Sequence, residues 1–146
     1  MENFAFNIKQ INTNIVKYIV LLGRILYSLM FLYSGPFLFS GMAAGYASSK
    51  GVPLASFLVP FSGVMAIVGG LLIVLGYKAK LGAWLIVAFL IPVTFIMHAF
   101  WKETDPMQKQ VQIAMFLRNI SMLGGAFLIT WFGTGPLSFD NRRKAR

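Results

Sequence analysis

Apolar residues fall into four long blocks, separated by short polar or small-residue segments. The blocks cover residues 15–39, 54–75, 81–100 and 111–132. Each is long enough for a helix that crosses a bilayer, which needs about 20 apolar residues. None alternates apolar and polar residues as a membrane barrel strand must, and the bilayer core offers an unpaired backbone no hydrogen bonds. The pattern therefore predicts an all-α membrane protein, a bundle of four transmembrane helices.

These blocks divide the chain into three parts. We expect residues 1–14 to form a cytoplasmic N-terminal segment, 15–132 the four-helix transmembrane domain and 133–146 a basic cytoplasmic tail. The link 76–80 leaves room only for a tight turn, so the second and third helices must be antiparallel neighbours. A cleaved signal peptide is disfavoured for the first block, because that block is too long and contains Arg24.

The composition also indicates a protein that lies in a lipid bilayer, and it excludes several kinds of functional site. Of the 146 residues, 58% are hydrophobic and 12% charged, with a mean hydropathy of +0.72, whereas a soluble domain carries about 25% charged residues. The sequence has no cysteine, which excludes disulfides and thiolate metal sites of its own. No Met-x-x-Met pattern, His–carboxylate cluster or nucleophile–base pair is present, so no catalytic or metal-ligating residue is expected.

Of the 13 basic residues behind the net charge of +9, all but Arg24 and Arg118 lie outside the apolar blocks or at their ends. Eight of them lie on one side of the expected membrane and three on the other. The larger set is Lys9, Lys17, Lys78, Lys80, Arg142, Arg143, Lys144 and Arg146, and the smaller set is Lys50, Lys102 and Lys109. The positive-inside rule then predicts that both termini are cytoplasmic. The only dense basic run is the short tail, so nucleic acid is not an expected partner.

Two arginines lie inside the apolar blocks, where a charge costs at least about 2.5–3.5 kcal/mol on insertion scales. Arg24 is about 10 Å along the first helix from Lys17 and shares a face with Tyr27 and Ser28, at spacings of three and four. One interpretation is that its long side chain reaches the cytoplasmic headgroups. The other is an internal site for an anion or polar headgroup, shared by Arg24, Tyr27 and Ser28.

Arg118 lies at a similar depth from the opposite membrane face, next to Asn119. The structural interpretation is an ion pair of Arg118 with Glu103 or Asp105, which would close the bundle. The functional interpretation is a pocket in which Arg118, Asn119 and His98 hold a polar head, such as a quinone carbonyl or a small anion. His98 could then exchange protons near neutral pH.

Short motifs also occur in an order and spacing that resemble a known family. They are Leu22-Gly23-Arg24, Ser34-Gly35, Gly51-Val52-Pro53, Gly69-Gly70-Leu71-Leu72, Leu75-Gly76, His98-Ala99-Phe100-Trp101, Phe116-Leu117-Arg118-Asn119 and Leu123-Gly124-Gly125. Over about Val20 to Ile129 the chain resembles the DoxX family, small four-helix proteins of the bacterial inner membrane. The segment Val64-Met65-Ala66-Ile67-Val68 departs from that family, which often has a Glu before the glycine pair.

The resemblance implies a multi-pass inner-membrane protein that is a subunit or partner of a quinone-linked or thiol-stress-linked redox system. Expected ligands are membrane lipid and a quinone, and expected partners are a soluble or membrane oxidoreductase and a second copy of the chain. Because that Glu and all cysteines are absent, independent catalytic activity is not expected.

Two other functions fit the same residues. Arg24 and Arg118, near opposite membrane faces, fit an oligomer through which small solutes or anions permeate. The chain could equally be a structural assembly factor, in which case Arg118 contributes only to stability.

Overall fold

The computed structural model describes residues 2–144, and the side chains of residues 15–141. Within this part the chain is all-helical and has no strand, which confirms the predicted fold class. The elements are α1 (Glu2–Ser34), the 3-10 helix η1 (Pro36–Phe39), α2 (Gly41–Ser49), α3 (Ala55–Leu75), α4 (Ala79–Pro92), the π-helix η2 (Val93–Met97), the 3-10 helix η3 (Phe100–Lys102), α5 (Pro106–Phe132) and α6 (Phe139–Lys144).

Four helical stretches are long and apolar enough to cross a membrane. They are Ile15–Phe39, Ala55–Leu75, Ala79–Lys102 and Pro106–Phe132. The last begins five residues before the expected residue 111, because the polar turn after Asp105 is already helical. The Asp105 side chain accepts a 2.7 Å hydrogen bond from the backbone N–H of Gln108, and Pro106 occupies a position where a missing N–H costs nothing.

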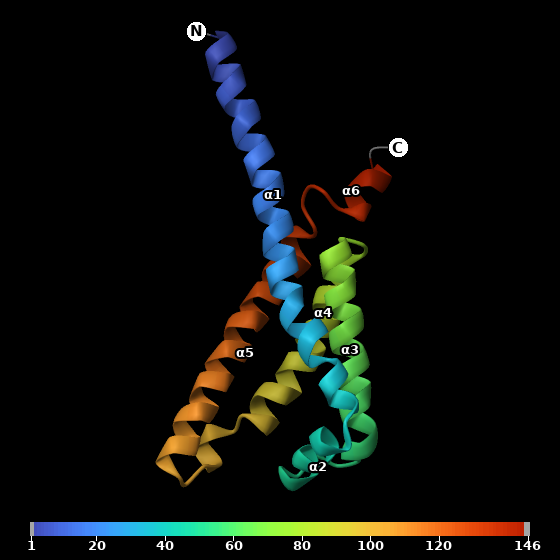
Figure 1. Ribbon diagram of the computed structural model, residues 1–146, viewed down its shortest axis with the longest axis vertical. Helices are drawn as coiled ribbons and strands as arrows, with labels where there is room; N and C mark the ends of the chain where they lie inside the picture. The colour runs from blue at the N-terminus through green and yellow to red at the C-terminus, as the bar shows by residue number, and fades with distance from the viewer. Residues whose placement is uncertain (1, 145–146) are drawn as a thin grey trace.

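The helices form an open bundle around the hairpin of α3 and α4 (Figure 1). α1 packs along α3, and α5 packs along α4. α2 lies across one end of the bundle. The other end, where α1 begins and α6 lies, is called the terminal end below. α1 projects beyond the other helices at the terminal end (Figure 1).

The α3–α4 hairpin depends on glycines at its turn and along its contact. Gly76 ends α3 in the left-handed region (φ 66°), and the next N–H, of Tyr77, donates to the carbonyl of Leu72 at 3.0 Å. A Cβ added to Gly69 would lie 2.9 Å from the carbonyl oxygen of Gly82, and a Cβ on Gly82 would lie 2.9 Å from that of Gly69. Because glycine has no side chain, the backbones of α3 and α4 can approach closely here, as is typical of membrane helices.

The positions of the basic residues agree with the grouping used to predict orientation. Lys78, just before α4, and Lys80, in its first turn, lie at the terminal end, whereas Lys50 follows α2 at the opposite end. The side chains of Lys9, Arg142, Arg143, Lys144 and Arg146 lie outside the described residues. Which end faces the cytoplasm stays a prediction.

Candidate functional site

Arg24 is buried in the protein. It lies on α1 with 5% of its surface exposed, and Nη2 donates a 2.6 Å hydrogen bond to the carbonyl oxygen of Leu137. Its Nε and Nη1 atoms are buried and have no hydrogen-bond partner. The interpretation in which Arg24 reaches the headgroups is therefore not what the structure shows, and a buried cation is left with two unused donors.

Ser28 lies one helical turn after Arg24 on the same face of α1. It is fully buried, with 0% exposed, and its Oγ has no partner. Buried hydroxyls normally bond to a protein group or to ordered water, and a helical serine often uses the carbonyl four residues before it. Arg24 and Ser28 thus bring three unpartnered polar atoms to one face.

The segment over Arg24, here named the C-terminal strap, comprises residues 133–140. Thr134 Oγ1 donates to Ser138 Oγ at 3.0 Å, and Ser138 Oγ donates to the carbonyl of Gly135 at 2.9 Å. The strap is also tied to the α3–α4 turn, since the N–H of Asp140 donates to the Gly76 carbonyl at 2.9 Å. The first half of the expected tail is therefore packed on the bundle.

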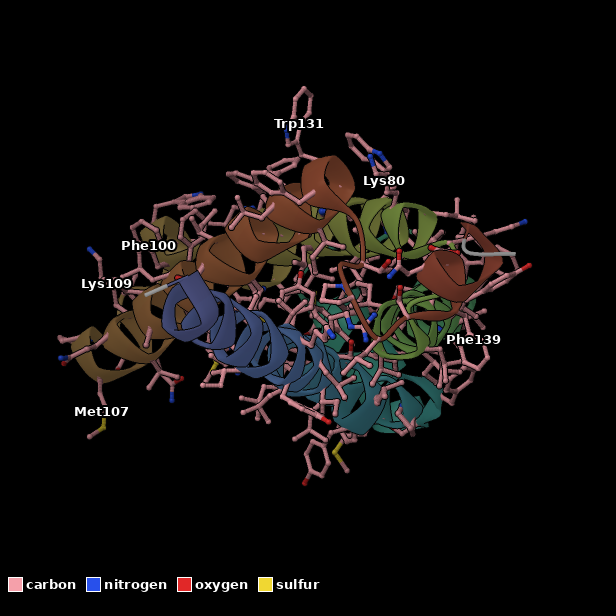
Figure 2. All side chains as sticks on the ribbon, turned by 90° about the horizontal axis from the view of Figure 1, so that it is seen from above. Lys80, Phe100, Met107, Lys109, Trp131 and Phe139 are labelled. Atoms are coloured by element: carbon pink, nitrogen blue, oxygen red, sulfur yellow. The ribbon has the colours of Figure 1, made fainter. Side chains whose placement is uncertain are left out.

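The strap forms one wall of a cleft at the terminal end. The cleft has a volume of about 780 Å³, and its lining includes Lys78, Lys80, Thr134, Asp140 and Asn141. Figure 2 looks down on this end and shows Lys80 and Phe139 projecting outward from it.

Tyr27 joins α1 to α5. Its hydroxyl donates a 2.8 Å hydrogen bond to the carbonyl oxygen of Met122. Gly125 leaves space for the ring, since a Cβ there would lie 2.8 Å from Tyr27 Cε2. The donor capacity of this hydroxyl is thus used in packing, so only Arg24 and Ser28 of the predicted first-helix site keep unused polar groups.

The structure places His98 beside α5, the helix that carries both Arg118 and Asn119. His98 Nδ1 lies 2.9 Å from Gln112 Oε1. Asn119 lies on the buried seam of α5 with Gln112, whereas neighbouring Arg118 is exposed. Asn119 has 2% of its surface exposed, and its Nδ2 has no partner.

The predicted ion pair of Arg118 with Glu103 or Asp105 is wrong. Glu103 instead forms a 2.6 Å ion pair with Lys50, which follows α2. The carboxylate of Asp105 caps the start of α5. Among residues 15–141 no ion pair joins Arg118 to either acid. The hydrogen bond to Glu103 raises the pKa of Lys50 above its ordinary value.

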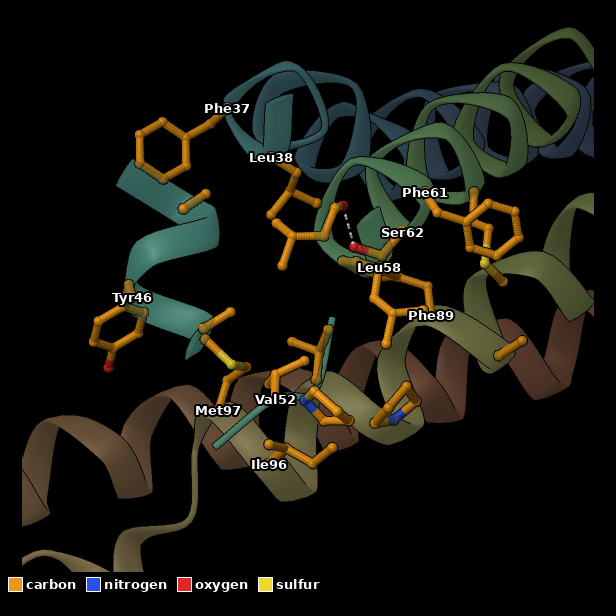
Figure 3. A pocket seen from close by; sticks show the side chains of 18 of the residues that line it. Phe37, Leu38, Tyr46, Val52, Leu58, Phe61, Ser62, Phe89, Ile96 and Met97 are labelled. Atoms are coloured by element: carbon orange, nitrogen blue, oxygen red, sulfur yellow. Dashed lines mark hydrogen bonds between the residues drawn. The ribbon is translucent and has the colours of Figure 1, made fainter. Parts of the chain in front are cut away.

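A large apolar cavity lies between η1, α2, α3 and the end of α4 (Figure 3). Its volume is about 740 Å³, and its lining includes Phe37, Leu38, Tyr46, Phe61, Phe89 and Ile96. Ser62 is the one serine in the lining. Its hydroxyl already has a hydrogen-bond partner, because Oγ donates to the carbonyl of Val59 at 2.7 Å (Figure 3). None of the six candidate ligand-binding residues lines this cavity.

Sequence reasoning missed the cavity, although two signals for it were present. The segment 41–49 is rich in Gly, Ala and Ser, and folds as α2 with Ala43 and Ala47 buried. Pro92 ends the regular α-helix, and the wider π-helical turn of Val93–Met97 follows it. Proline and π-helical turns both break the regular hydrogen-bond pattern of a helix, and Pro92, Val93, Ile96 and Met97 from this stretch line the cavity.

Comparison with known proteins identifies relatives along nearly the whole chain. A model of the SURF4 family matches residues 3–146. The chain is similar to the inner membrane protein YqjF of Escherichia coli, with 29% identity over 123 residues, which cover 83% of the chain and 88% of that protein. No solved structure matches it.

Two eukaryotic relatives are longer. The Surfeit locus protein 4 homolog of Drosophila melanogaster is 36% identical over 76 residues, 50% of the chain and 27% of that protein. The ER-derived vesicles protein ERV29 of Saccharomyces cerevisiae is 27% identical over 84 residues, 58% of the chain and 27% of that protein. The chain therefore spans about a quarter of each of these proteins.

The resemblance to the DoxX family is corrected by these matches, because the family model and the relatives are those of SURF4. Most of the motifs that suggested DoxX contain glycines. Glycines such as Gly69 allow two membrane helices to approach closely, and this packing requirement is common to membrane bundles of many families. Such motifs therefore discriminate poorly between small four-helix families.

Proposed function

The chain belongs to the SURF4 family of integral membrane proteins, and we propose that it binds a membrane amphiphile. The apolar chain of a phospholipid or of a quinone enters the cavity between α2, α3 and α4, and the polar head stays at its edge. The observation that carries this proposal is the cavity itself, about 740 Å³ in volume and almost without polar groups in its lining. Sites of this size and character are typical of small-molecule binding.

The edge of the cavity offers a place for the polar head. Tyr46 belongs to the lining, and the ammonium group of Lys50 lies 5.7 Å from the centre of its ring. Lys50 is paired with Glu103, so this edge carries charges of both signs. An amphiphile would then have its chain among apolar side chains and its head beside an aromatic ring and an ion pair.

Localisation to a bacterial inner membrane is part of the proposal. The relatives YqjF and YphA of Escherichia coli are both named inner membrane proteins, and the match covers 88% and 69% of their respective lengths. The redox partnership rested on the DoxX resemblance and has lost that support.

Lipid extraction from the purified protein tests the proposal. The protein is isolated in mild detergent, and retained lipids and quinones are quantified by mass spectrometry. We expect one class of amphiphile to be retained at a fixed ratio to protein. Ala88→Trp should lower that ratio about tenfold, equivalent to about 1.4 kcal/mol, because Ala88 lines the cavity with its side chain exposed.

Ala114→Trp is the matched control. Ala114 is also an exposed alanine on a membrane-spanning helix, but it does not line the cavity. Retention should be unchanged in this variant. Equal loss in both variants, or no retained amphiphile in the unmodified protein, would contradict the proposal.

A further inference from the structure

We propose that the terminal end of the bundle holds a binding site for a phosphate group, formed by Arg24, Lys78 and Lys80 and covered by the C-terminal strap. The site is separate from the apolar cavity, whose lining lies around α2 and shares no residue with it.

Arg24 has no counter-charge among the described side chains. The acids with described side chains are Glu103, Asp105 and Asp140. Glu103 is paired with Lys50 and Asp105 caps α5, both at the other end of the bundle. Asp140 Oδ1 accepts a 3.0 Å hydrogen bond from the N–H of Lys78, and no ion pair joins it to Arg24. A buried cation is unfavourable unless it is paired, so an anion beside Arg24 would be stabilised there.

The group that meets Arg24 is a backbone carbonyl held in an unusual conformation. Leu137, whose carbonyl accepts from Nη2, has φ 55°, in the left-handed region that a branched residue rarely adopts. Gly133 and Gly135 in the same strap also have positive φ, at 76° and 65°. A phosphate in place of this carbonyl would accept two charge-assisted hydrogen bonds from the guanidinium, and Leu137 could then leave the left-handed region.

The cleft beside the strap has the charge and the apolar neighbours that a lipid phosphate needs. Lys78 and Lys80 are two basic residues in its lining, against the single acidic residue Asp140. Leu81 and Phe132, both exposed apolar residues, line the same cleft. The phosphate of an anionic phospholipid would meet the lysines while its chains run along Leu81 and Phe132.

The strap links the cleft to Arg24. Thr134 and Asp140 line the cleft, and Leu137 between them contacts Arg24. The strap therefore reaches from the lining of the cleft to Arg24. Displacement of Leu137 would extend the site from the two exposed lysines to the buried guanidinium.

Retention of phosphatidylglycerol by the full chain in nanodiscs tests the site. Protein loaded with this lipid is exchanged into phosphatidylcholine nanodiscs, and bound phosphatidylglycerol is counted by native mass spectrometry. Lys78→Gln with Lys80→Gln should lower retention roughly tenfold, since each basic residue near an anionic headgroup contributes measurably to its binding. Both lysines are exposed, so this variant keeps the fold. Asp140→Asn should raise retention a few-fold, because it removes the opposing charge.

The matched control is Lys102→Gln with Lys109→Gln, which removes two exposed lysines at the opposite end. Retention should not change in this variant, and an equal loss would overturn the proposal by showing non-specific attraction. A second arm adds inorganic phosphate to protein in phosphatidylcholine alone and measures the melting temperature. An increase that the Lys78/Lys80 variant abolishes supports the site with free phosphate as its source. Absence of both lipid retention and a phosphate effect overturns the proposal.

Discussion

The hydroxyl of Tyr27 donates a 2.8 Å hydrogen bond to the carbonyl oxygen of Met122, 95 residues later in the chain. This contact joins α1 to α5, two helices that otherwise pack on α3 and α4 respectively. Gly125 lies against the same ring. Tyr27 therefore links the first and last membrane-spanning helices.

Tyr27→Phe should lower the free energy of unfolding by about 0.5–1 kcal/mol, the lower part of the range for a single hydrogen bond. The loss is small because the Met122 carbonyl keeps its place in the helical hydrogen-bond pattern of α5. Thermal unfolding in a fixed detergent measures the change. Tyr33→Phe is the control, because Tyr33 is 83% exposed. If both variants lose the same free energy of unfolding, the hydrogen bond between Tyr27 and Met122 does not contribute to stability.

Gly69→Ala and Gly82→Ala should each lower stability by about 1–3 kcal/mol, the usual cost of overpacking. In each variant the new methyl group would lie 2.9 Å from a backbone oxygen of the opposite helix, so relief requires α3 and α4 to separate. Unfolding midpoints of the purified variants measure the effect.

Gly124→Ala is the control for this pair. Nothing lies within 4 Å of a Cβ at Gly124, and alanine is favoured over glycine inside a helix by up to about 1 kcal/mol. This variant should be neutral or slightly more stable. If Gly124→Ala is destabilised as much as Gly69→Ala, the close contact between α3 and α4 does not explain the effect at Gly69.

The ion pair of Lys50 with Glu103 should contribute about 0.2–1 kcal/mol, because both side chains are partly exposed, at 28% and 22%. A double-mutant cycle of Lys50→Met and Glu103→Gln measures this coupling. The coupling should shrink as salt is added. A coupling that does not depend on salt would show a contact of another kind.

The pH dependence of this pair follows from the pKa of Lys50, which the hydrogen bond to Glu103 raises above the ordinary 10.5. A raised pKa means that the folded state holds the proton more tightly than the unfolded state. The contribution is thus fully present below pH 10.5 and is lost as the pH rises through the folded value. Unfolding midpoints of wild type and Lys50→Met should converge above that pH and differ at neutral pH.

Orientation can be measured directly because the chain contains no cysteine. Ser48→Cys on α2 and Lys80→Cys at the terminal end place single thiols at opposite ends of the bundle. With cytoplasmic termini, a membrane-impermeant maleimide should label Ser48→Cys in intact cells and Lys80→Cys only after the membrane is broken. The reverse pattern would show that the positive-inside prediction is wrong.

Several contacts at the site could not be read from the sequence. Asp105 and Glu103 are separated by one residue, yet one caps α5 and the other pairs with Lys50. Local spacing could not separate these roles, since Lys50 is 53 positions from Glu103. The contact of the strap with Arg24 could not be predicted from local spacing either, because Leu137 and Arg24 are 113 positions apart in the sequence.

The sequence by itself determined that the protein lies in a lipid bilayer, that it has four membrane-spanning helices, and that α3 and α4 form an antiparallel hairpin. Block length and turn length are local properties, and the bilayer allows an apolar block few alternatives to a helix. It also identified Arg24 as exceptional, since a charge in an apolar block is costly wherever its side chain points. Tertiary structure alone decided that Arg24 is buried beneath the strap, that Glu103 pairs with Lys50 and that α2 closes an apolar cavity. These outcomes depend on how helices distant in sequence pack together, and glycines, prolines and small residues permit several such packings.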